Sequence, residues 1–183
     1  QQEWLFQRLS QIERYFKNVN FEYLILDGMS SDTTSNKLRL LSKKKIIYVR
    51  QRDKNLYDAI NKGVKIASGD YIFLIHSGDI FYNDFVLSKI QKKLYQNPDV
   101  IYGNLKYYTI KKNIIYIERI WKQRIKKISK FNVFKIPHTT IIIKKELLNK
   151  LNYYKTEFSI SSDMDFMIRL SQLKKINLIY LNT

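Results

Sequence analysis

Short apolar runs alternate with segments of helical period along the first part of this chain, and this alternation constrains the fold more than any other feature. The runs occupy residues 21–26, 46–49, 71–75 and 100–103, and each is rich in residues of high β propensity. Strands that alternate with helices build a mostly parallel sheet with right-handed crossovers. The sequence therefore predicts an α/β fold in which helices flank a mostly parallel central sheet.

Amphipathic helices are predicted between these runs. Apolar side chains recur at helical spacing in residues 5–16, 56–67 and 86–94, and a shorter helix is expected around residues 38–41. These helices supply the apolar faces that would cover the sheet.

The rest of the chain is less regular. We expect a β pair at 105–110 and 113–120, a strand at 139–145, a helix at 161–173 and a last strand at 176–181. Because neither a repeat nor a low-complexity linker interrupts the sequence, we expect a single domain over residues 1–183.

Charge is the most unusual property of the composition. The chain has 33 Lys and Arg against 16 Asp and Glu, a net charge of +17, which favours an anionic partner such as a nucleotide phosphate or an acidic membrane. A Lys-, Asn- and Ile-rich coding bias is the alternative cause. The chain has no Cys, which agrees with a cytoplasmic setting, and no apolar run of about eighteen residues, so we expect a soluble protein.

Four aspartates occupy related positions. Asp27, Asp53, Asp79 and Asp163 each adjoin an apolar run, where a strand ends or a helix begins. Acids gathered at one edge of a sheet can bind Mg²⁺ or Mn²⁺, which prefer oxygen ligands and bridge to substrate phosphates. A single Asp of this kind is more often a turn former or a helix cap.

The polar residues after the run at 71–75 form the most compact candidate site. His76, Gly78 and Asp79 follow that run directly, and open α/β sheets bind ligands beyond the carboxyl ends of such strands. Gly78 gives the backbone the freedom to turn tightly beside Asp79. His138 follows a Pro and precedes a strand, and it is either functional or a structural surface histidine.

Several other enzyme classes are excluded by the motifs. The sequence has no GxGxxG after its first run, no Gly-Lys-Ser or Gly-Lys-Thr phosphate loop, no GxSxG and no HExxH. No nucleic-acid-binding signature accompanies the basic charge, so we expect no nucleic-acid partner.

Five segments together resemble a known family. They are "EYLILDGMSSDTT", "RDKNLYDAINKGVKIASGDYIFLIHSGD", "DVIYGN", "PHTTIIIKKELL" and "SISSDMDFMIRL". Their order and approximate spacing are similar to those of the inverting family-two glycosyltransferases with a GT-A fold, and above all to bacterial members that build surface polysaccharides. The resemblance covers about residues 22–170.

The resemblance implies roles for particular residues. Asp27 matches the acid that helps to hold the nucleotide, and Asp53 and Asn61 match positions that line the donor site. Asp79 matches the last acid of the metal-binding motif, where Mn²⁺ or Mg²⁺ bridges the donor diphosphate. Asp163 matches the catalytic base. The implied partners are a nucleotide-sugar donor and a glycan or lipid-linked acceptor.

The chain departs from the family pattern in two motifs. His76 and Gly78 stand where many relatives carry acidic or amide residues, which leaves Asp79 as the one carboxylate there. Ser162 stands where an acid often precedes the base, so Asp165 is a rival to Asp163. A non-catalytic basic module on the same fold is the alternative function.

The resemblance also predicts an organisation in two halves. Residues 1–104 would bind the nucleotide sugar and residues 105–183 would form the acceptor side. The family normally begins with an apolar strand and a Pro-containing loop, which this sequence lacks; we expect that strand to have been trimmed from a longer sequence, with a degenerate copy as the alternative.

The stretch "ERIWKQRIKKISKF", residues 118–131, combines apolar and basic side chains. Trp121, Ile125 and Ile128 recur at helical spacing among many Lys and Arg residues. Such a segment predicts a basic amphipathic helix that binds peripherally to the anionic inner face of a membrane. Packing of the three apolar residues on the sheet is the alternative.

Overall fold

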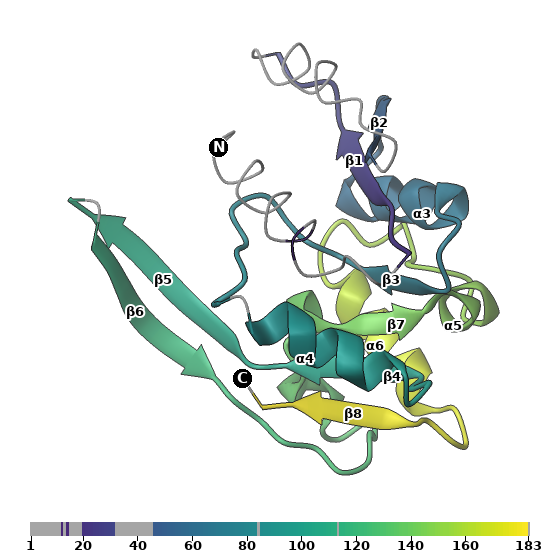
Figure 1. Ribbon diagram of the computed structural model, residues 1–183. Coiled ribbons are helices and arrows are strands. Elements are labelled where there is room, and N and C mark those ends of the chain that lie inside the picture. The colour runs from purple at the N-terminus through teal and green to yellow at the C-terminus, as the bar shows by residue number, and fades with distance from the viewer. Residues whose placement is uncertain are drawn as a thin grey trace.

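The α/β class that the sequence predicts is confirmed by the computed structural model (Figure 1). The structure describes residues 12, 14, 20–31, 46–83, 85–112 and 114–182. The strands are β1 (Tyr23–Asp27), β2 (Ile46–Arg50), β3 (Tyr71–Phe73), β4 (Val100–Gly103), β5 (Leu105–Lys111), β6 (Ile114–Trp121), β7 (Ile142–Lys144) and β8 (Leu178–Leu181). The helices are α3 (Leu56–Ile66), α4 (Phe85–Leu94), α5 (Lys145–Lys150) and α6 (Ser162–Ser171), with two 3₁₀ turns, η1 (Val133–Lys135) and η2 (His138–Thr140).

The central sheet has the strand order β3-β7-β4-β8. β4 and β8 are parallel, whereas β7 pairs antiparallel with both β3 and β4, so three strands point one way and β7 alone points back. β1 and β2 form a separate parallel pair among the described residues. The predicted parallel direction therefore holds for β3, β4 and β8, and the reversal of β7 was not predicted.

The two faces of the central sheet are covered by different helices, because successive side chains of a strand point to opposite faces. Ile101 and Ile142 pack with Leu87 and Ile90 of α4. Their neighbours along β4 and β7 pack on the other face, with side chains from α3, α5 and α6. Figure 1 shows α4 across the near face and α6 behind the sheet.

The chain around β7 differs from the predicted strand at 139–145. It divides into η2, the three residues of β7 and helix α5, and β3 is likewise shorter than predicted, ending at Phe73. The predicted helix at 38–41 and most of the one at 5–16 lie outside the described residues, although Ile12 is helical and buried against the α4 side of the core.

The predicted helix at 118–131 is wrong. Residues up to Trp121 belong to β6, and the following residues are irregular. Ile125 and Ile128 are buried in the core, and the Tyr102 hydroxyl accepts a hydrogen bond from the Ile125 backbone N–H at 2.6 Å. Packing against the body of the protein, the alternative reading, therefore holds for these two isoleucines.

The predicted β pair at 105–110 and 113–120 is confirmed as the antiparallel hairpin β5–β6, which projects from the body of the protein (Figure 1). Its register shifts at Tyr107 and Tyr108, where a bulge strengthens the local twist. Across the described ranges, none of the helices is long and apolar enough to span a bilayer.

Leu170 provides a test of the core on the α6 face. Its side chain has no exposed area, whereas Ile168 on the same helix is 37% exposed. We expect Leu170→Ala to lower the free energy of unfolding by about 2–5 kcal/mol, because it removes buried methyl groups and leaves a cavity. Ile168→Ala, the matched control, should cost about 1 kcal/mol or less. Urea unfolding measures both, and equal losses would contradict the packing described for α6.

Candidate functional site

The reversed strand β7 determines which residues meet at the edge of the sheet. Because β7 is antiparallel to β3 and β4, it begins where those strands end, with Ile142 opposite both Phe73 and Ile101. The residues that precede β7, in η2, therefore lie beyond the carboxyl ends of β3 and β4. This is the position where ligands bind in open α/β sheets.

Asp163 lies in the first turn of α6 and is held from two sides. The Tyr57 hydroxyl of α3 donates a hydrogen bond to its Oδ1 at 2.8 Å. The Nδ1 atom of His138, in η2, lies 3.1 Å from its Oδ2. Three elements far apart in sequence thus converge on one carboxylate, and the preceding residue, Ser162, is completely buried.

Aromatic rings form a wall beside Asp163. The rings of Tyr57 and Tyr154 stack with centroids 5.7 Å apart, and Tyr154 packs against Phe166 at 4.8 Å. Burial raises the pKa of Tyr57, and its hydrogen bond to Asp163 raises that pKa further. Burial also raises the pKa of Tyr154. Both phenols therefore stay neutral at physiological pH, and Tyr57 remains a donor to the carboxylate.

Asn61 fixes the backbone of Tyr154, one of these aromatic residues. Its Nδ2 donates to the backbone carbonyl of Tyr154 at 2.7 Å, and its Oδ1 accepts from the Tyr154 backbone N–H at 3.0 Å. Both ends of the amide are thus engaged in fixing the segment that carries Tyr154. The role in donor binding that the sequence predicts for Asn61 stays a prediction.

Asp27 is buried at the carboxyl end of β1, where several donors surround it. Its Oδ1 accepts from the Ser30 backbone N–H at 2.7 Å, its Oδ2 accepts from the Tyr48 hydroxyl at 2.5 Å, and Arg50 Nε lies 3.5 Å away. Burial by itself raises the pKa of Asp27, but the hydrogen bonds from Ser30 and Tyr48 and the charge of Arg50 outweigh it. The net pKa is lowered, so Asp27 is an anion at neutral pH.

Asp53 lies next to the loop that follows Asp27. A Cβ added to Gly28 would lie 3.8 Å from an Asp53 carboxylate oxygen, which places the two loops side by side. Lys62 Nζ lies 2.8 Å from Asp53 and 2.8 Å from Asp58. The structure therefore places Asp53 beside the turn that follows Asp27, and the donor-site roles predicted for both residues stay predictions.

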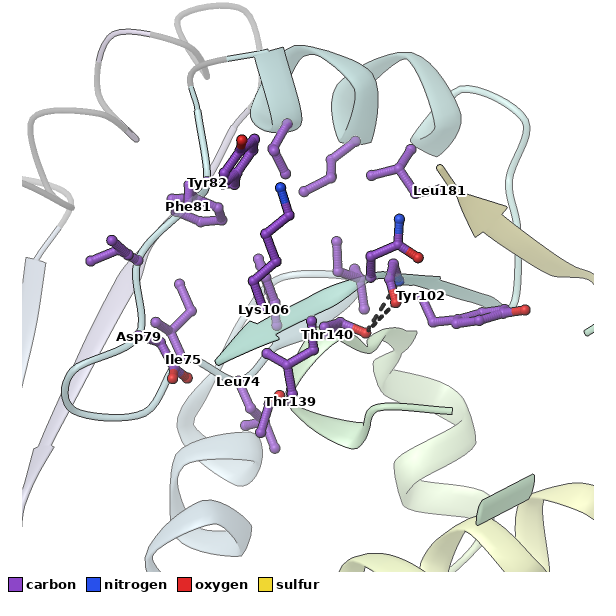
Figure 2. Close-up of a pocket in the computed structure, with 18 of the residues that line it drawn as sticks. Leu74, Ile75, Asp79, Phe81, Tyr82, Tyr102, Lys106, Thr139, Thr140 and Leu181 are labelled. Atoms are coloured by element: carbon purple, nitrogen blue, oxygen red, sulfur yellow. Dashed lines mark hydrogen bonds between the residues drawn. The ribbon is translucent and has the colours of Figure 1, made fainter. Parts of the chain in front are cut away.

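Asp79 lies in the turn that follows β3 and borders a cavity of about 450 Å³ (Figure 2). Its Oδ2 accepts from the His76 backbone N–H at 2.9 Å. Gly78 has φ of 90°, in the left-handed region that favours glycine, and its carbonyl accepts from the Tyr108 hydroxyl of the hairpin at 2.8 Å. This confirms the tight turn that the sequence predicts beside Asp79.

The cavity has mainly apolar walls from β3, β4, α4 and the hairpin, with a few polar side chains between them. Figure 2 shows Lys106 rising through it toward the ring of Tyr82, whose centroid lies 3.0 Å from the lysine Nζ. Thr139 and Thr140 line it from η2. The adjacent His138 contacts Asp163, which also binds Tyr57. The single turn η2 therefore links the cavity beside Asp79 to this group of three side chains, the Asp163 cluster.

The described residues contain no group of three or more Asp, Glu or His side chains arranged to hold a metal ion. Asp79 would therefore supply one ligand, with phosphate oxygens of a bound substrate and water completing the shell. Mg²⁺ is commonly held in this way, by one or two carboxylates plus substrate phosphates. A cation site at Asp79 would thus depend on a bound diphosphate for most of its ligands, and the metal predicted there stays a prediction.

Comparison with solved structures identifies the fold class. A crystal structure of S. aureus TarS 1-349 matches with a TM-score of 0.72 and 16% identity, covering 98% of this chain and 54% of that one. The structure of the same protein in complex with UDP-GlcNAc matches with a TM-score of 0.71 and 15% identity, covering 99% and 55%. The fold is that of the GT-A glycosyltransferases.

Comparison of sequences identifies the family. The model of Glycosyl transferase family 2 matches residues 4–152, and this chain belongs to that family. An uncharacterized glycosyltransferase of Rickettsia conorii is 34% identical over 102 residues, which are 55% of this chain and 17% of that protein. A PGL/p-HBAD biosynthesis glycosyltransferase of Mycobacterium bovis is 23% identical over 158 residues, 82% of this chain and 58% of that protein. This chain thus spans less than two thirds of either relative.

Tyr57 is the site residue that sequence reasoning missed. A tyrosine on the apolar side of a predicted helix is usually a core residue, and nothing in the local pattern distinguishes one that donates to Asp163. The Pro before it makes His138 a candidate from the sequence, but the sequence does not reveal the partner of its side chain. Only the approach of α3, η2 and α6 reveals these contacts.

Asp27→Asn tests whether the negative charge of Asp27, at the carboxyl end of β1, stabilises the fold. The lowered pKa means that the Asp27 carboxylate contributes stability that is fully present above the unfolded pKa of about 3.9 and is lost as the pH falls through the lower folded value. The variant should be less stable than wild type at pH 7, by about 1–3 kcal/mol, and the difference should shrink below about pH 4. Urea unfolding between pH 7 and pH 3 measures it.

Tyr48→Phe is the companion variant. It removes one donor to Asp27 while keeping the ring, so the folded pKa of Asp27 should rise toward the unfolded value, and the loss of stability on acidification should be smaller than in wild type and should be complete at a higher pH. A stability difference between wild type and Asp27→Asn that is constant from pH 7 to pH 3 would show that the charge of Asp27 is not involved.

Proposed function

We propose that this chain is the catalytic domain of an inverting glycosyltransferase. It would transfer a sugar from a nucleotide-sugar donor to a hydroxyl of a glycan or lipid-linked acceptor, in the synthesis of cell-surface polysaccharide. The observation that carries the proposal is a pair of carboxylates on the two sides of η2. Asp79 borders the cavity, and Asp163 lies between the side chains of Tyr57 and His138. Family membership and the fold shared with a protein solved with UDP-GlcNAc support it.

The donor would bind along the carboxyl ends of β1 and β3. Asp27 and Asp53 would hold the nucleoside, and Asp79 would hold Mn²⁺ or Mg²⁺ together with the diphosphate. The bound cation would offset the negative charge that develops on the leaving nucleoside diphosphate. Lys106, in the cavity that Asp79 borders, is a further cation within this region.

The acceptor would approach from the side of Asp163. Its hydroxyl oxygen forms a bond to the anomeric carbon as the bond from that carbon to the diphosphate breaks, and attack from the opposite face inverts the configuration. The hydroxyl proton must leave in the same step, and we assign its removal to Asp163. Tyr57, a neutral donor, orients the carboxylate for this task.

The structure favours Asp163 over its rival Asp165 for this role. Asp165 Oδ2 lies 2.7 Å from Arg169 Nη2, and its Oδ1 lies 3.3 Å from Lys155 Nζ. Arg169 also donates to backbone carbonyls of residues 151 and 153, so Asp165 belongs to a network that ties α6 to the preceding loop. That network gives Asp165 a structural function.

Replacement of Asp79 tests donor binding. Asp79→Asn should still fold but should lose most of the Mn²⁺-dependent affinity for nucleoside diphosphates and at least about 10²-fold in transfer rate, because a charge-stabilising contact is gone. Isothermal titration with UDP, with and without Mn²⁺, and a transfer assay over a panel of nucleotide sugars measure the two effects. Asp70→Asn, an exposed acid before β3 at the opposite end of that strand, is the matched control.

The same titration decides between the enzyme and a non-catalytic basic module. A module that binds anions through its surface charge should bind UDP weakly, with or without Mn²⁺, and should lose the binding in salt. Metal-dependent binding that survives salt, together with sugar transfer, supports the glycosyltransferase.

Asp163→Asn should separate binding from chemistry. We expect donor affinity to remain and transfer to fall about 10²- to 10⁴-fold, the usual loss when a general base is removed. Asp165→Asn should lower stability, because Arg169 loses its partner, and should affect transfer less. Transfer rates, donor affinities and unfolding curves for the two variants give the comparison, and a larger loss of transfer in Asp165→Asn would move the base to that residue.

Peripheral contact with an anionic membrane is part of the proposal, but through the β5–β6 hairpin in place of the helix expected at 118–131. Both faces of the hairpin expose large apolar side chains, those of Tyr107, Ile110, Ile114, Ile115, Tyr116, Ile117 and Ile120. Lys111 and Lys112 lie at its exposed turn. An acidic leaflet attracts each such basic residue by about 1 kcal/mol, and apolar side chains beside them add to the affinity.

Liposome flotation tests this contact. The chain should bind vesicles that contain phosphatidylglycerol, bind less in high salt, and bind less when Lys111 and Lys112 are both changed to Glu. The double change of Lys174 and Lys175 to Glu, exposed residues outside the hairpin, is the charge-matched control and should reduce binding less. Equal effects of the two double variants, or equal binding to neutral vesicles, would contradict the proposed role of the hairpin.

A further inference from the structure

More than half of the net charge of the chain, +17 in all, comes from one segment, residues 119–145. This segment has no Asp or Glu, and its nine basic residues are Arg119, Lys122, Arg124, Lys126, Lys127, Lys130, Lys135, Lys144 and Lys145. A coding bias raises the lysine content of a whole chain, but it does not remove the acids from one segment. The concentration of charge is therefore a property of this segment.

The part of this segment between β6 and η2, residues 122–136, is an irregular connection that is fixed to the body of the protein. Its anchors are buried apolar side chains, those of Ile125, Ile128, Val133 and Ile136. Asn132 closes a turn within it: its Oδ1 accepts from the Ser129 backbone N–H at 2.8 Å, and its Nδ2 donates to the Lys127 carbonyl at 3.0 Å. The side chains between the anchors are thus presented to solvent from a fixed backbone.

Six exposed basic side chains cover the outside of this connection, which we call the basic connection. They belong to Lys122, Arg124, Lys126, Lys127, Lys130 and Lys135. Within the described part of the chain, none of the six forms an ion pair with an acid. Like charges that have no acidic partners repel one another, and a ligand with several negative charges would relieve this repulsion.

Two exposed aromatic rings stand among these cations. Phe131 is 76% exposed and Phe134 is 50% exposed, and Lys130 Nζ lies 5.1 Å from the centroid of the Phe131 ring. The C–H face of a pyranose ring packs on an aromatic ring, and a cation beside the ring binds an anionic substituent of the same sugar. A simple anion makes no use of the rings, so the combination fits an acidic sugar better.

The basic connection leads directly into the candidate active site. η1, which carries Phe134, contacts α6, and Asp163 lies in the first turn of that helix. The chain then continues through Pro137 into η2, where His138 Nδ1 lies 3.1 Å from Asp163 Oδ2. A glycan of several sugar units that lies along the connection therefore reaches the carboxylate to which we assign removal of the acceptor proton.

We propose that the basic connection binds the acceptor, and that this acceptor is an anionic glycan whose sugar rings carry carboxylate or phosphate groups. This inference rests on the proposed glycosyltransferase function and specifies the class of its acceptor. The lysines contact the anionic groups, and Phe131 and Phe134 pack on the sugar rings. A membrane surface fits the connection less well, because its aliphatic side chains are turned into the core, whereas the hairpin exposes such side chains.

Binding of oligosaccharides tests the charge requirement without any transfer. In isothermal titrations at low salt, tetragalacturonate and a mannose 6-phosphate pentasaccharide should each bind at least about tenfold more tightly than neutral maltotetraose. Their relative affinities tell whether carboxylate or phosphate is preferred. Equal affinity for the neutral and the anionic oligosaccharides would overturn the proposal.

Charge reversal locates the binding surface. The double change of Lys126→Glu and Lys127→Glu should weaken binding of the anionic oligosaccharides at least about tenfold. The charge-matched control is Lys174→Glu with Lys175→Glu, exposed residues that follow the last turn of α6, and it should weaken binding less than about threefold. Equal effects of the two double variants would show that the overall charge attracts these ligands and would overturn the proposal.

Phe131→Ala separates recognition of a sugar from attraction of an anion. It should weaken binding of the anionic oligosaccharides about three- to tenfold and leave the affinity for inorganic tripolyphosphate unchanged, because tripolyphosphate has no sugar ring. Unchanged oligosaccharide affinity in this variant would overturn the assignment of the ring to a sugar.

Two other anionic partners are outcomes of the same comparison. Phosphatidylglycerol vesicles should bind the Lys126→Glu, Lys127→Glu variant nearly as well as wild type, and a larger loss for vesicles than for oligosaccharides would make the connection a membrane contact. An oligouridylate that binds more tightly than both anionic oligosaccharides, and loses affinity in the same variant, would assign the surface to nucleic acid. Either result would overturn the proposal.

The transfer assay distinguishes this inference from the proposed function. With an anionic acceptor, the Lys126→Glu, Lys127→Glu variant should have a KM for the acceptor raised about tenfold, with kcat and UDP affinity unchanged. If no nucleotide sugar is transferred to any acceptor, the proposed function fails whatever the titrations show. If sugar is transferred equally well to neutral and anionic acceptors, and the variant leaves the acceptor KM unchanged, this inference alone fails.

Discussion

The reversed direction of β7 is the constraint on which the site depends. β7 lies between β3 and β4 and runs against both, so the turn that leads into it is held beyond their carboxyl ends. That turn carries His138 toward Asp163, and its two threonines line the cavity beside Asp79. A parallel β7 would place the same turn at the opposite edge, where none of these side chains could meet.

The carboxylates of the site have different kinds of partners. Asp27 is buried and surrounded by donors, which lower its pKa, and Asp53 is paired with a lysine. Asp163 is held by a neutral phenol and an imidazole, with rings stacked beside it. A buried anion near the proposed nucleotide site and a carboxylate beside a half-exposed imidazole near the proposed acceptor site suit different tasks, binding in the first case and proton transfer in the second.

The segment at 118–131 shows how a local pattern can mislead. Its apolar residues fit a helical period, yet residues up to Trp121 pair with β5, and Ile125 and Ile128 are buried in the core. Strand pairing and burial depend on partners elsewhere in the chain, and such tertiary interactions commonly outweigh the preference of a short segment. The hairpin leaves its apolar residues exposed on both faces, which a helical reading of the sequence does not predict.

The sequence by itself determined the α/β class, the positions of most helices and strands, and the placement of aspartates at strand ends, because these follow from periodicity over a few neighbouring residues. Only the tertiary structure decided the direction of β7 and the partners of Asp163. Tyr57 lies 106 residues from Asp163 along the chain, so no local pattern can report their hydrogen bond. Contacts of this kind arise from the packing of whole elements, and here the packing of α3, η2 and α6 creates the chemistry of the site.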